Sequence, residues 1–456
     1  MSRVWAVAKN SFVSAMRMKT AIVFMLLLII LLPIMSLTTT GDGTIKGRIQ
    51  SFISYGLGLT GLLLSILTIV VACHTLSTDI KHKRIYSVIT KPIRRFEFVL
   101  GKVLGVVILD FLLLVVFSSV IYALVLQMPK FAKANAEDIQ QLKNEFFTAR
   151  ASLKMSVDTD MLKARVEDAY KNMKAAGELD QNKSKEAVMN ELMASAKYSM
   201  FSAEPGGMVL WEFNNVKPFD ANDILYVRLK FNASQIPPDN LLYGVWYVGD
   251  YRQVQSGEQA KTPIYAVPRK DVAKTVREFQ VPADAVAADG YLAIVFVNEP
   301  ANNSTIIFSE EDGLEVLYKA GSFSANYLRA VLVIFSRLVF FAILGVSLTT
   351  WLGFPVAILC CFVVFFSGVI NGFITNSFEY IAAYLQILYK FTIKPFILLL
   401  PKFDENYNIN NYIIDAKLIN NGFLAMALIS LAIKSFILLI AGFIIFAKRE
   451  IARVIV

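Results

Sequence analysis

The sequence predicts a polytopic α-helical membrane protein with six transmembrane helices and an extracytoplasmic α+β insert. Of its 456 residues, 56% are hydrophobic and 18% are charged, and the mean hydropathy is +0.54. Six apolar runs have about 20 residues, the length that crosses a hydrocarbon core of about 30 Å. These predicted spans are residues 20–38, 52–75, 103–127, 327–350, 354–376 and 424–446.

The distribution of charge predicts how these spans are oriented. The stretches before the first span, between the second and third, and after the last carry 14 Lys or Arg and 3 Asp or Glu. Residues 128–325 carry 22 and 27. Because basic residues stay on the cytoplasmic side, we expect both termini and the loop 77–102 inside and the insert outside. We also expect the chain to reside in the cytoplasmic (inner) membrane. Its net charge of +9 reflects topology, with no nucleic-acid partner.

Residues 1–19 are predicted to form an interfacial helix. Trp5, Ala8, Phe12 and Met16 recur at helical spacing, which suits a helix whose apolar side lies in the acyl boundary of the membrane. The alternative is a cytosolic tail that does not contact the membrane.

Within residues 20–127, which hold the first three spans, the loop 77–102 is strongly basic. It carries seven Lys or Arg against the two acids Asp79 and Glu97. Pro92 divides it into two short helical pieces, because proline ends a helical hydrogen-bond ladder and disfavours helix in the residue before it. A short, basic, helical loop between two membrane helices is suited to docking on a cytosolic protein. The candidate docking residues are Arg84, Lys91, Pro92, Arg94, Arg95 and Glu97.

The extracytoplasmic insert changes its sequence pattern near the middle. Residues 128–204 are rich in Ala, Lys, Glu, Met and Leu, which favours helices, and breaks at 156–160 and 177–184 predict three of them. In residues 205–325, short runs of alternating β-branched and aromatic residues are separated by turn clusters, a pattern typical of an antiparallel β-sandwich. Because the insert has no cysteine, we expect burial alone to hold its core, through Trp211, Phe213, Leu225, Val227, Trp246 and Phe296.

Residues 326–456 hold spans four to six and one ambiguous segment. Residues 379–400 are long enough to cross the membrane, but Lys390, Lys394 and a proline interrupt them. A crossing here would place the basic C-terminal stretch outside, against the positive-inside rule. We therefore expect an external hairpin over 379–423, with a further crossing as the alternative.

Three charged residues lie inside predicted spans: Asp110, Arg337 and Lys434. Charges in the membrane core are costly, and they usually pair with one another or face a polar cavity. These three residues therefore predict either a polar translocation path or an ion pair between halves of the bundle. The alternative is a structural role, through snorkelling toward the interface or through one stabilising pair.

The sequence lacks the motifs of common enzymes. It has no G-x-x-x-x-G-K-[ST] phosphate loop, no G-x-S-x-G elbow and no H-E-x-x-H pair, and His74 and His82 are its only histidines. No cysteine or histidine cluster has the spacing of metal ligands. We therefore expect no catalytic, cofactor or metal site in this chain.

The run K-P-I-R-R-F-E-F-V-L-G-K-V-L-G, which begins at Lys91, resembles the first intracellular loop of type-2 ABC exporter permeases. In that family the loop is the coupling helix, which receives force from an ATP-binding-cassette subunit. The Gly-Thr or Arg-Thr pair common in the family loop reads Arg84-Ile85 here. The family also has a connecting helix before the first span and an external hairpin before the last. The resemblance covers residues 1–127 and 327–456.

The resemblance implies the permease subunit of an ATP-driven exporter. Such a subunit would form a dimer in the lipid membrane with a second copy or a paralogue. Each permease would contact an ABC ATPase subunit, and that partner would bind ATP and Mg²⁺. The insert would then cover the outlet or recruit an envelope protein. The alternative is a non-transporting membrane receptor or scaffold that presents its extracytoplasmic domain to an external ligand and needs no ATPase.

Overall fold

The computed structural model of the chain divides into two compact units. One, called here the membrane unit, comprises Met1–Thr148 and Ser322–Val456, and the other, the sheet unit, comprises Ala149–Gly321. The structure describes residues 2–81, 93–131, 135–154, 159–176, 185–218, 223–237, 240–256, 261–310, 312–372, 389, 391–392, 394–395, 400–403 and 409–448.

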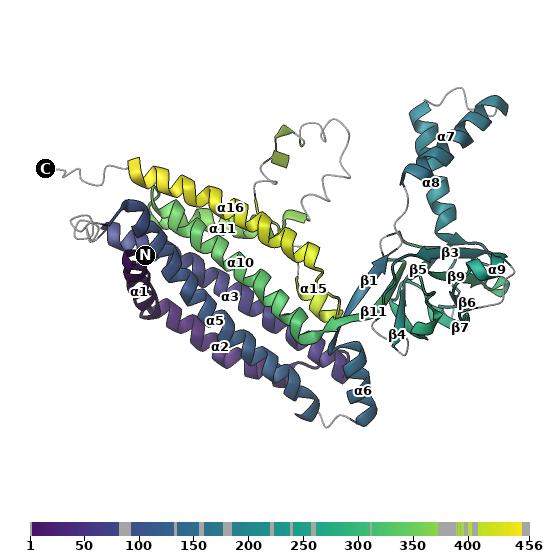
Figure 1. Cartoon of the computed structure of the whole chain (residues 1–456), viewed down its shortest axis with the longest axis horizontal. Helices are drawn as coiled ribbons and strands as arrows, with labels where there is room; N and C mark the ends of the chain where they lie inside the picture. Colours follow the sequence, from purple (N-terminus) through teal and green to yellow (C-terminus); the bar gives the residue numbers. More distant parts are fainter. Residues whose placement is uncertain are drawn as a thin grey trace. The chain divides into compact units, whose positions relative to one another are not determined.

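Among the described residues, five helices of the membrane unit are long and apolar enough to cross a membrane, which marks the chain as a multi-pass membrane protein. They run side by side in one bundle (Figure 1). These helices are α2 (Lys19–Thr38), α3 (Ile45–Lys81), α5 (Arg95–Phe131), α10 (Phe323–Thr349) and α16 (Asn421–Lys448).

The prediction of a sixth span is not confirmed. In the region 354–376, helix α11 (Phe354–Val369) has 16 residues, about 24 Å at 1.5 Å per residue, whereas the hydrocarbon core is about 30 Å thick. Residues 373–376 lie outside the described residues, and so does much of the predicted hairpin 379–423. The described end of that hairpin forms the short helix α15 (Ile409–Ile414) before α16.

The N-terminal helix α1 (Ser2–Met16) packs against α5 through small residues. A Cβ atom built on Gly101 or Gly105 would lie 2.6 Å from a side-chain Cβ of α1 in either case. Only glycine therefore lets the two helices approach this closely, as in small-residue contacts between membrane helices. Ala8 is fully buried, whereas Trp5 is 61% exposed. The predicted apolar stripe is thus divided between a helix contact and an exposed face.

The helices α3 and α10 form the centre of the bundle, whereas α2 and α16 leave broad apolar faces uncovered. Such faces are unfavourable in water and suit contact with lipid or with another membrane helix. On α16 the exposed residues recur at helical spacing: Met426, Ile429, Ile433, Phe436, Ile437, Ile440 and Ile444.

In its described residues, the sheet unit has two four-stranded sheets, with strand orders β1-β11-β4-β8 and β3-β9-β6-β7, and a three-stranded sheet β2-β10-β5. The strands are β1 (Thr148–Lys154), β2 (Ser202–Ala203), β3 (Met208–Phe213), β4 (Ile224–Leu229), β5 (Phe231–Ala233), β6 (Leu241–Gly249), β7 (Tyr265–Val272), β8 (Arg277–Pro282), β9 (Leu292–Asn298), β10 (Ile306–Phe308) and β11 (Leu314–Ser322).

One hydrophobic core joins the two four-stranded sheets. The ring of Trp246 on β6 stacks on Trp211 of β3, with centroids 6.0 Å apart, and lies 5.7 Å from Phe279 of β8 in the other sheet. Large aromatic side chains carry much of the burial energy of such cores. The predicted core is confirmed, because all six residues are buried: Trp211, Phe213, Leu225, Val227, Trp246 and Phe296.

Residues 128–204 contain strands where the sequence predicts only helices. The three helices exist as α6 (Ala136–Glu145), α7 (Thr159–Ala176) and α8 (Lys185–Met200), but β1 lies between α6 and α7, and β2 follows α8. The β1 sequence T-A-R-A-S-L-K consists largely of residues that also suit a helix. Its strand conformation depends on its neighbour β11, which is distant in sequence, and such context commonly overrides local propensity.

Candidate functional site

The basic segment between α3 and α5 contains the predicted docking residues. Helix α3 ends at Lys81 and α5 begins at Arg95. Arg84, Lys91 and Pro92 lie outside the described residues, so the structure describes only the second half of the predicted docking set.

Glu97 stabilises the start of α5. Its carboxylate accepts a hydrogen bond of 2.8 Å from the backbone N–H of Arg94. An acidic residue at the third helical position characteristically satisfies this free donor, and its charge is favourable near the positive end of the helix dipole. The Arg94 side chain is exposed and is therefore available to a partner.

Arg95 connects the start of α5 to the end of α16. One of its guanidinium nitrogens donates to the carbonyls of Phe446, at 3.2 Å, and Ala447, at 2.7 Å. The ring of Phe98 stacks on Phe446 with centroids 6.4 Å apart. Carbonyls in the last turn of a helix lack intrahelical partners, and a cation is favourable there. Arg95 therefore holds two helices of this chain together.

Lys102 is buried in the membrane unit, although the sequence places it in the cytosolic loop. Its ammonium group forms an ion pair of 2.5 Å with Asp79 of α3 and donates to the carbonyl of Thr75 at 3.3 Å. It also lies 5.4 Å from the ring centre of Phe98. Only 4% of the Lys102 side chain is exposed, so this pair links α3 and α5 internally.

Asp110 on α5 is completely buried. Neither of its carboxylate oxygens has a hydrogen-bond partner among the described residues. The nearby Thr68 hydroxyl donates to the carbonyl of Leu64 at 2.7 Å. Within the described part of the chain, Asp110 therefore forms no ion pair with Arg337 or Lys434.

Arg337 and Lys434, by contrast, line one cavity. It has a volume of about 260 Å³ and lies between α10, α16 and residues 400–403. Lys402 is a third cation in its wall, and no acidic residue belongs to the described lining. The remaining lining residues are uncharged: Val333, Ile334, Leu400, Pro401, Phe403, Ile409, Ala427, Ser430 and Leu431.

Aromatic rings and one backbone carbonyl surround the two membrane cations. The Arg337 guanidinium lies 4.8 Å from the ring centre of Phe403 and 5.4 Å from that of Phe365. Its Nε is buried without a hydrogen-bond partner among the described residues. The Lys434 ammonium donates to the carbonyl of Leu400 at 2.6 Å. The cavity therefore keeps donor capacity that the described residues do not use.

This cavity lies near the middle of both helices. Arg337 follows the start of α10 by 14 residues and Lys434 follows the start of α16 by 13, or about 20 Å along each helix axis. The backbone N–H of Phe403 donates to the carbonyl of Gly368, near the end of α11, at 3.0 Å. Non-helical backbone at membrane depth occurs only where protein buries it or where it lines a cavity.

The sheet unit has a separate apolar pocket of about 310 Å³. It lies over the side of β9 whose residues alternate with the core residues Ile294 and Phe296. Apart from tyrosine hydroxyls its lining side chains are apolar. They belong to Met208, Tyr247, Tyr251, Val254, Ile264, Ala293, Val295 and Val297, with Gly249 completing the wall.

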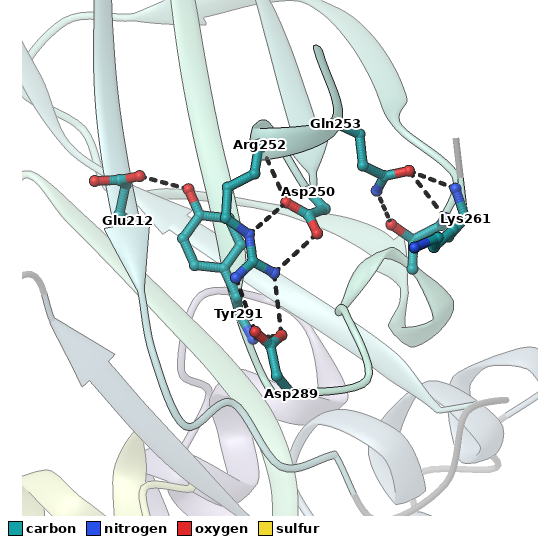
Figure 2. Close-up of polar contacts among 8 residues, drawn as sticks. Glu212, Asp250, Arg252, Gln253, Lys261, Asp289 and Tyr291 are labelled. Atoms are coloured by element: carbon teal, nitrogen blue, oxygen red, sulfur yellow. Dashed lines mark hydrogen bonds and ion pairs between the residues drawn. The ribbon is translucent and has the colours of Figure 1, made fainter. Parts of the chain in front are cut away.

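Figure 2 shows a polar network around Arg252. Tyr291 of this network packs in one small cluster with Ala293 and Tyr251 of the pocket wall. Arg252 donates to Asp250 on one side, at 2.9 Å, and to Asp289 on the other, at 2.8 Å. Its guanidinium lies 3.9 Å from the ring centre of Tyr291, and the Tyr291 hydroxyl donates to Glu212 at 2.5 Å.

Electrostatics in this network favour one fixed charge state. Hydrogen bonds from Arg252 lower the pKa of Asp289 to about 2 and also lower the pKa of Asp250. Burial and the hydrogen bond to Glu212 raise the pKa of Tyr291. Arg252 bonds to both Asp250 and Asp289, and Glu212 accepts the hydrogen bond of Tyr291, so we assign the network to stabilising helix α9 (Arg252–Ser256).

Sequence reasoning found Arg337 and Lys434 but missed Lys402, which lies in a segment predicted to be external. Its place in the cavity depends on contacts between segments far apart in the chain, and no local pattern signals it.

Compared with known proteins, the chain matches no family model and no curated protein.

Proposed function

We propose that this chain is the transmembrane permease subunit of an ATP-driven ABC exporter. The observation that carries the proposal is the basic segment between α3 and α5, bounded by helices of 37 residues each. Such helices measure about 55 Å and therefore extend beyond a hydrocarbon core of about 30 Å. A basic loop on such extensions would be accessible to a cytosolic protein.

In this proposal, a separate ATPase subunit binds ATP and Mg²⁺ and pushes on the basic segment. Arg95 joins the start of α5 to the end of α16, so the displacement would reach both helices together. A second copy or a paralogue would cover the exposed apolar face of one of the outer helices. Both termini would be cytoplasmic, in the cytoplasmic membrane, with the sheet unit on the outer side.

The test compares two charge reversals on exposed basic residues. Arg94→Glu changes a side chain in the docking segment, whereas the matched control Lys9→Glu changes one on α1. Arg95→Glu is less suitable, because it would also remove the bonds to α16. The tagged chain would be purified from its native membrane, and a co-purified protein with phosphate-loop motifs would be assayed for ATP hydrolysis.

We expect Arg94→Glu to reduce the amount of ATPase subunit that co-purifies, or to make its ATP hydrolysis independent of this chain. Lys9→Glu should leave both the co-purification and the coupled hydrolysis unchanged. Loss of one partner of an interfacial charge pair often costs about 2–5 kcal/mol. Equal recovery and equal coupling in both variants would argue against docking through this segment.

The second candidate is a receptor or scaffold that presents the sheet unit to an external ligand. The apolar pocket beside β9 favours it, because exposed apolar surfaces often mark binding sites. Under this function the chain would act without an ATPase. If inactivation of the candidate ATPase subunit left the activity of this chain in cells unchanged, that result would favour the receptor over the exporter.

A further inference from the structure

We propose that the cavity between α10, α16 and residues 400–403 binds the anionic group of an amphiphilic molecule, a phosphate or carboxylate attached to an apolar tail. The statement that such amphiphiles are the exported substrates rests on the proposed export function. Binding itself requires neither ATP nor a partner subunit, so it can be tested separately.

Charge is the first argument. Arg337, Lys434 and Lys402 line the cavity, and its described lining contains no acidic residue. Arg337 and Lys434 are partly buried, whereas Lys402 is exposed. Like charges repel strongly where the surroundings are weakly polar, and charges removed from water require compensation. An anion bound among the three cations would supply that compensation.

Hydrogen-bonding capacity is the second argument. The Nε of Arg337 is a buried donor without a partner among the described residues. A guanidinium presents its donors in a planar fork that matches the oxygens of a carboxylate or phosphate. Lys434 uses one donor on the carbonyl of Leu400, and an ammonium group has three donors. Both side chains can therefore bond to an anion without losing their observed contacts.

Size and lining indicate an amphiphile. A volume of about 260 Å³ is below the usual 300–1,000 Å³ of pockets that enclose a whole drug-sized ligand, so the cavity suits a head group. Val333, Ile334 and Leu431 form apolar wall, and α16 exposes Ile429 and Ile433 on nearby turns. A tail could therefore leave the cavity along apolar surface.

Snorkelling does not explain these charges. Both cations stand about 20 Å from the starts of helices of 27 and 28 residues, which are about 40 Å long, and therefore lie near the middle of each helix. Snorkelling is a property of long basic side chains near helix ends. The Arg337 guanidinium instead contacts the rings of Phe365 and Phe403, and its Nε is buried.

The experiment measures binding to the purified full chain in a nonionic detergent. The probe is a fluorescent short-chain phosphatidic acid, displaced by unlabelled phosphatidic acid, by phosphatidylcholine of equal chain length, or by inorganic phosphate. Phosphatidylcholine tests the need for net negative charge, and inorganic phosphate tests the need for a tail. We expect phosphatidic acid to bind at least about tenfold more tightly than either competitor.

Two variants test the site. Arg337→Gln combined with Lys434→Gln removes both charges and should weaken binding about 10- to 100-fold, the range expected for hydrogen bonds to charged groups. Ser430→Leu narrows the cavity and keeps both charges, so it should also weaken binding and serves if the double variant does not fold. The matched control is Lys448→Gln at the exposed end of α16, which should bind as the wild type does.

Unchanged binding in a folded double variant and in Ser430→Leu would overturn the site. Equal binding of phosphatidylcholine would overturn the requirement for an anion, and equal binding of inorganic phosphate would overturn the amphiphile. Binding that depends on Arg337 in a chain that never associates with an ATPase would support the site and refute the exporter. Association with an ATPase in a chain that lacks such binding would support the exporter and refute the site.

Discussion

Replacing Lys102 by methionine should strongly destabilise the membrane unit. Methionine keeps an apolar chain of similar length, so the change mainly removes charge. It leaves the Asp79 carboxylate, whose side chain is only 16% exposed, without its cation 2.5 Å away. Removing one partner of a buried ion pair costs about 3–5 kcal/mol. Because Asp79 keeps some contact with solvent, we expect the lower end, about 3 kcal/mol.

The double variant Asp79→Asn with Lys102→Met should recover most of this loss. It contains no unpaired charge, and replacement of both members of a buried pair is often nearly neutral. The coupling energy between the two sites should therefore be about 2–3 kcal/mol, within the range for residues in direct contact. The remaining loss would come from the hydrogen bond to Thr75 and the contact with the ring of Phe98.

The assay is reversible unfolding of the detergent-solubilised chain by sodium dodecyl sulfate, followed by helical circular dichroism. Lys130→Met, at the exposed end of the same helix, is the matched control and should change stability by less than about 0.5 kcal/mol. A loss below about 1 kcal/mol for Lys102→Met, or a double variant as unstable as the single one, would refute the buried pair as a stabilising link.

Three further predictions concern other contacts. Gly105→Leu should detach α1 from α5 and lower the stability of the membrane unit by about 1–3 kcal/mol, because its Cβ would lie 2.6 Å from the Cβ of Ser11. Increased cleavage of α1 by protease would report the detachment, and unchanged protection of α1 would contradict it. Residues 149–321 expressed alone should melt cooperatively, and Trp246→Ala should remove about 3–5 kcal/mol of its stability; a fragment that does not fold would refute its independence. In that fragment the folded pKa of Asp289 is about 2, below its ordinary 3.8, so its stabilisation is present above about pH 4 and lost as pH falls toward 2. Arg252→Gln should flatten this acid dependence in melting curves, and an unchanged pH profile would count against the network.

Elements with strong local signals could be predicted from the sequence. The five long helices follow from apolar runs of sufficient length. The core residues of the sheet unit follow from alternation, since Trp211 and Trp246 are buried whereas the next residues, Glu212 and Tyr247, are exposed. Glu97 could also have been recognised as a helix cap, because an acidic residue at the third helical position has a known local role.

Elements that depend on distant contacts could not be predicted. Strand β1 has no strong strand propensity and depends on its sheet neighbour β11. Lys102 reads as a loop cation, and only the packing of α5 against α3 shows that Asp79 neutralises it. Lys402 joins the membrane cavity because residues 400–403 lie against α10 and α16, an arrangement that hydropathy alone does not encode.

The predicted docking segment and the cavity share helix α16. Arg95 contacts the carbonyls of Phe446 and Ala447 at one end of this helix, and Lys434 lies 12 residues before Phe446, about 18 Å along its axis. An α-helix is bonded along its whole length and moves largely as a rigid element, so displacement of Arg95 would also displace Lys434 relative to α10. In the proposed exporter, force on the basic segment would therefore change the distance between Lys434 and Arg337, and with it the affinity of the cavity for an anion.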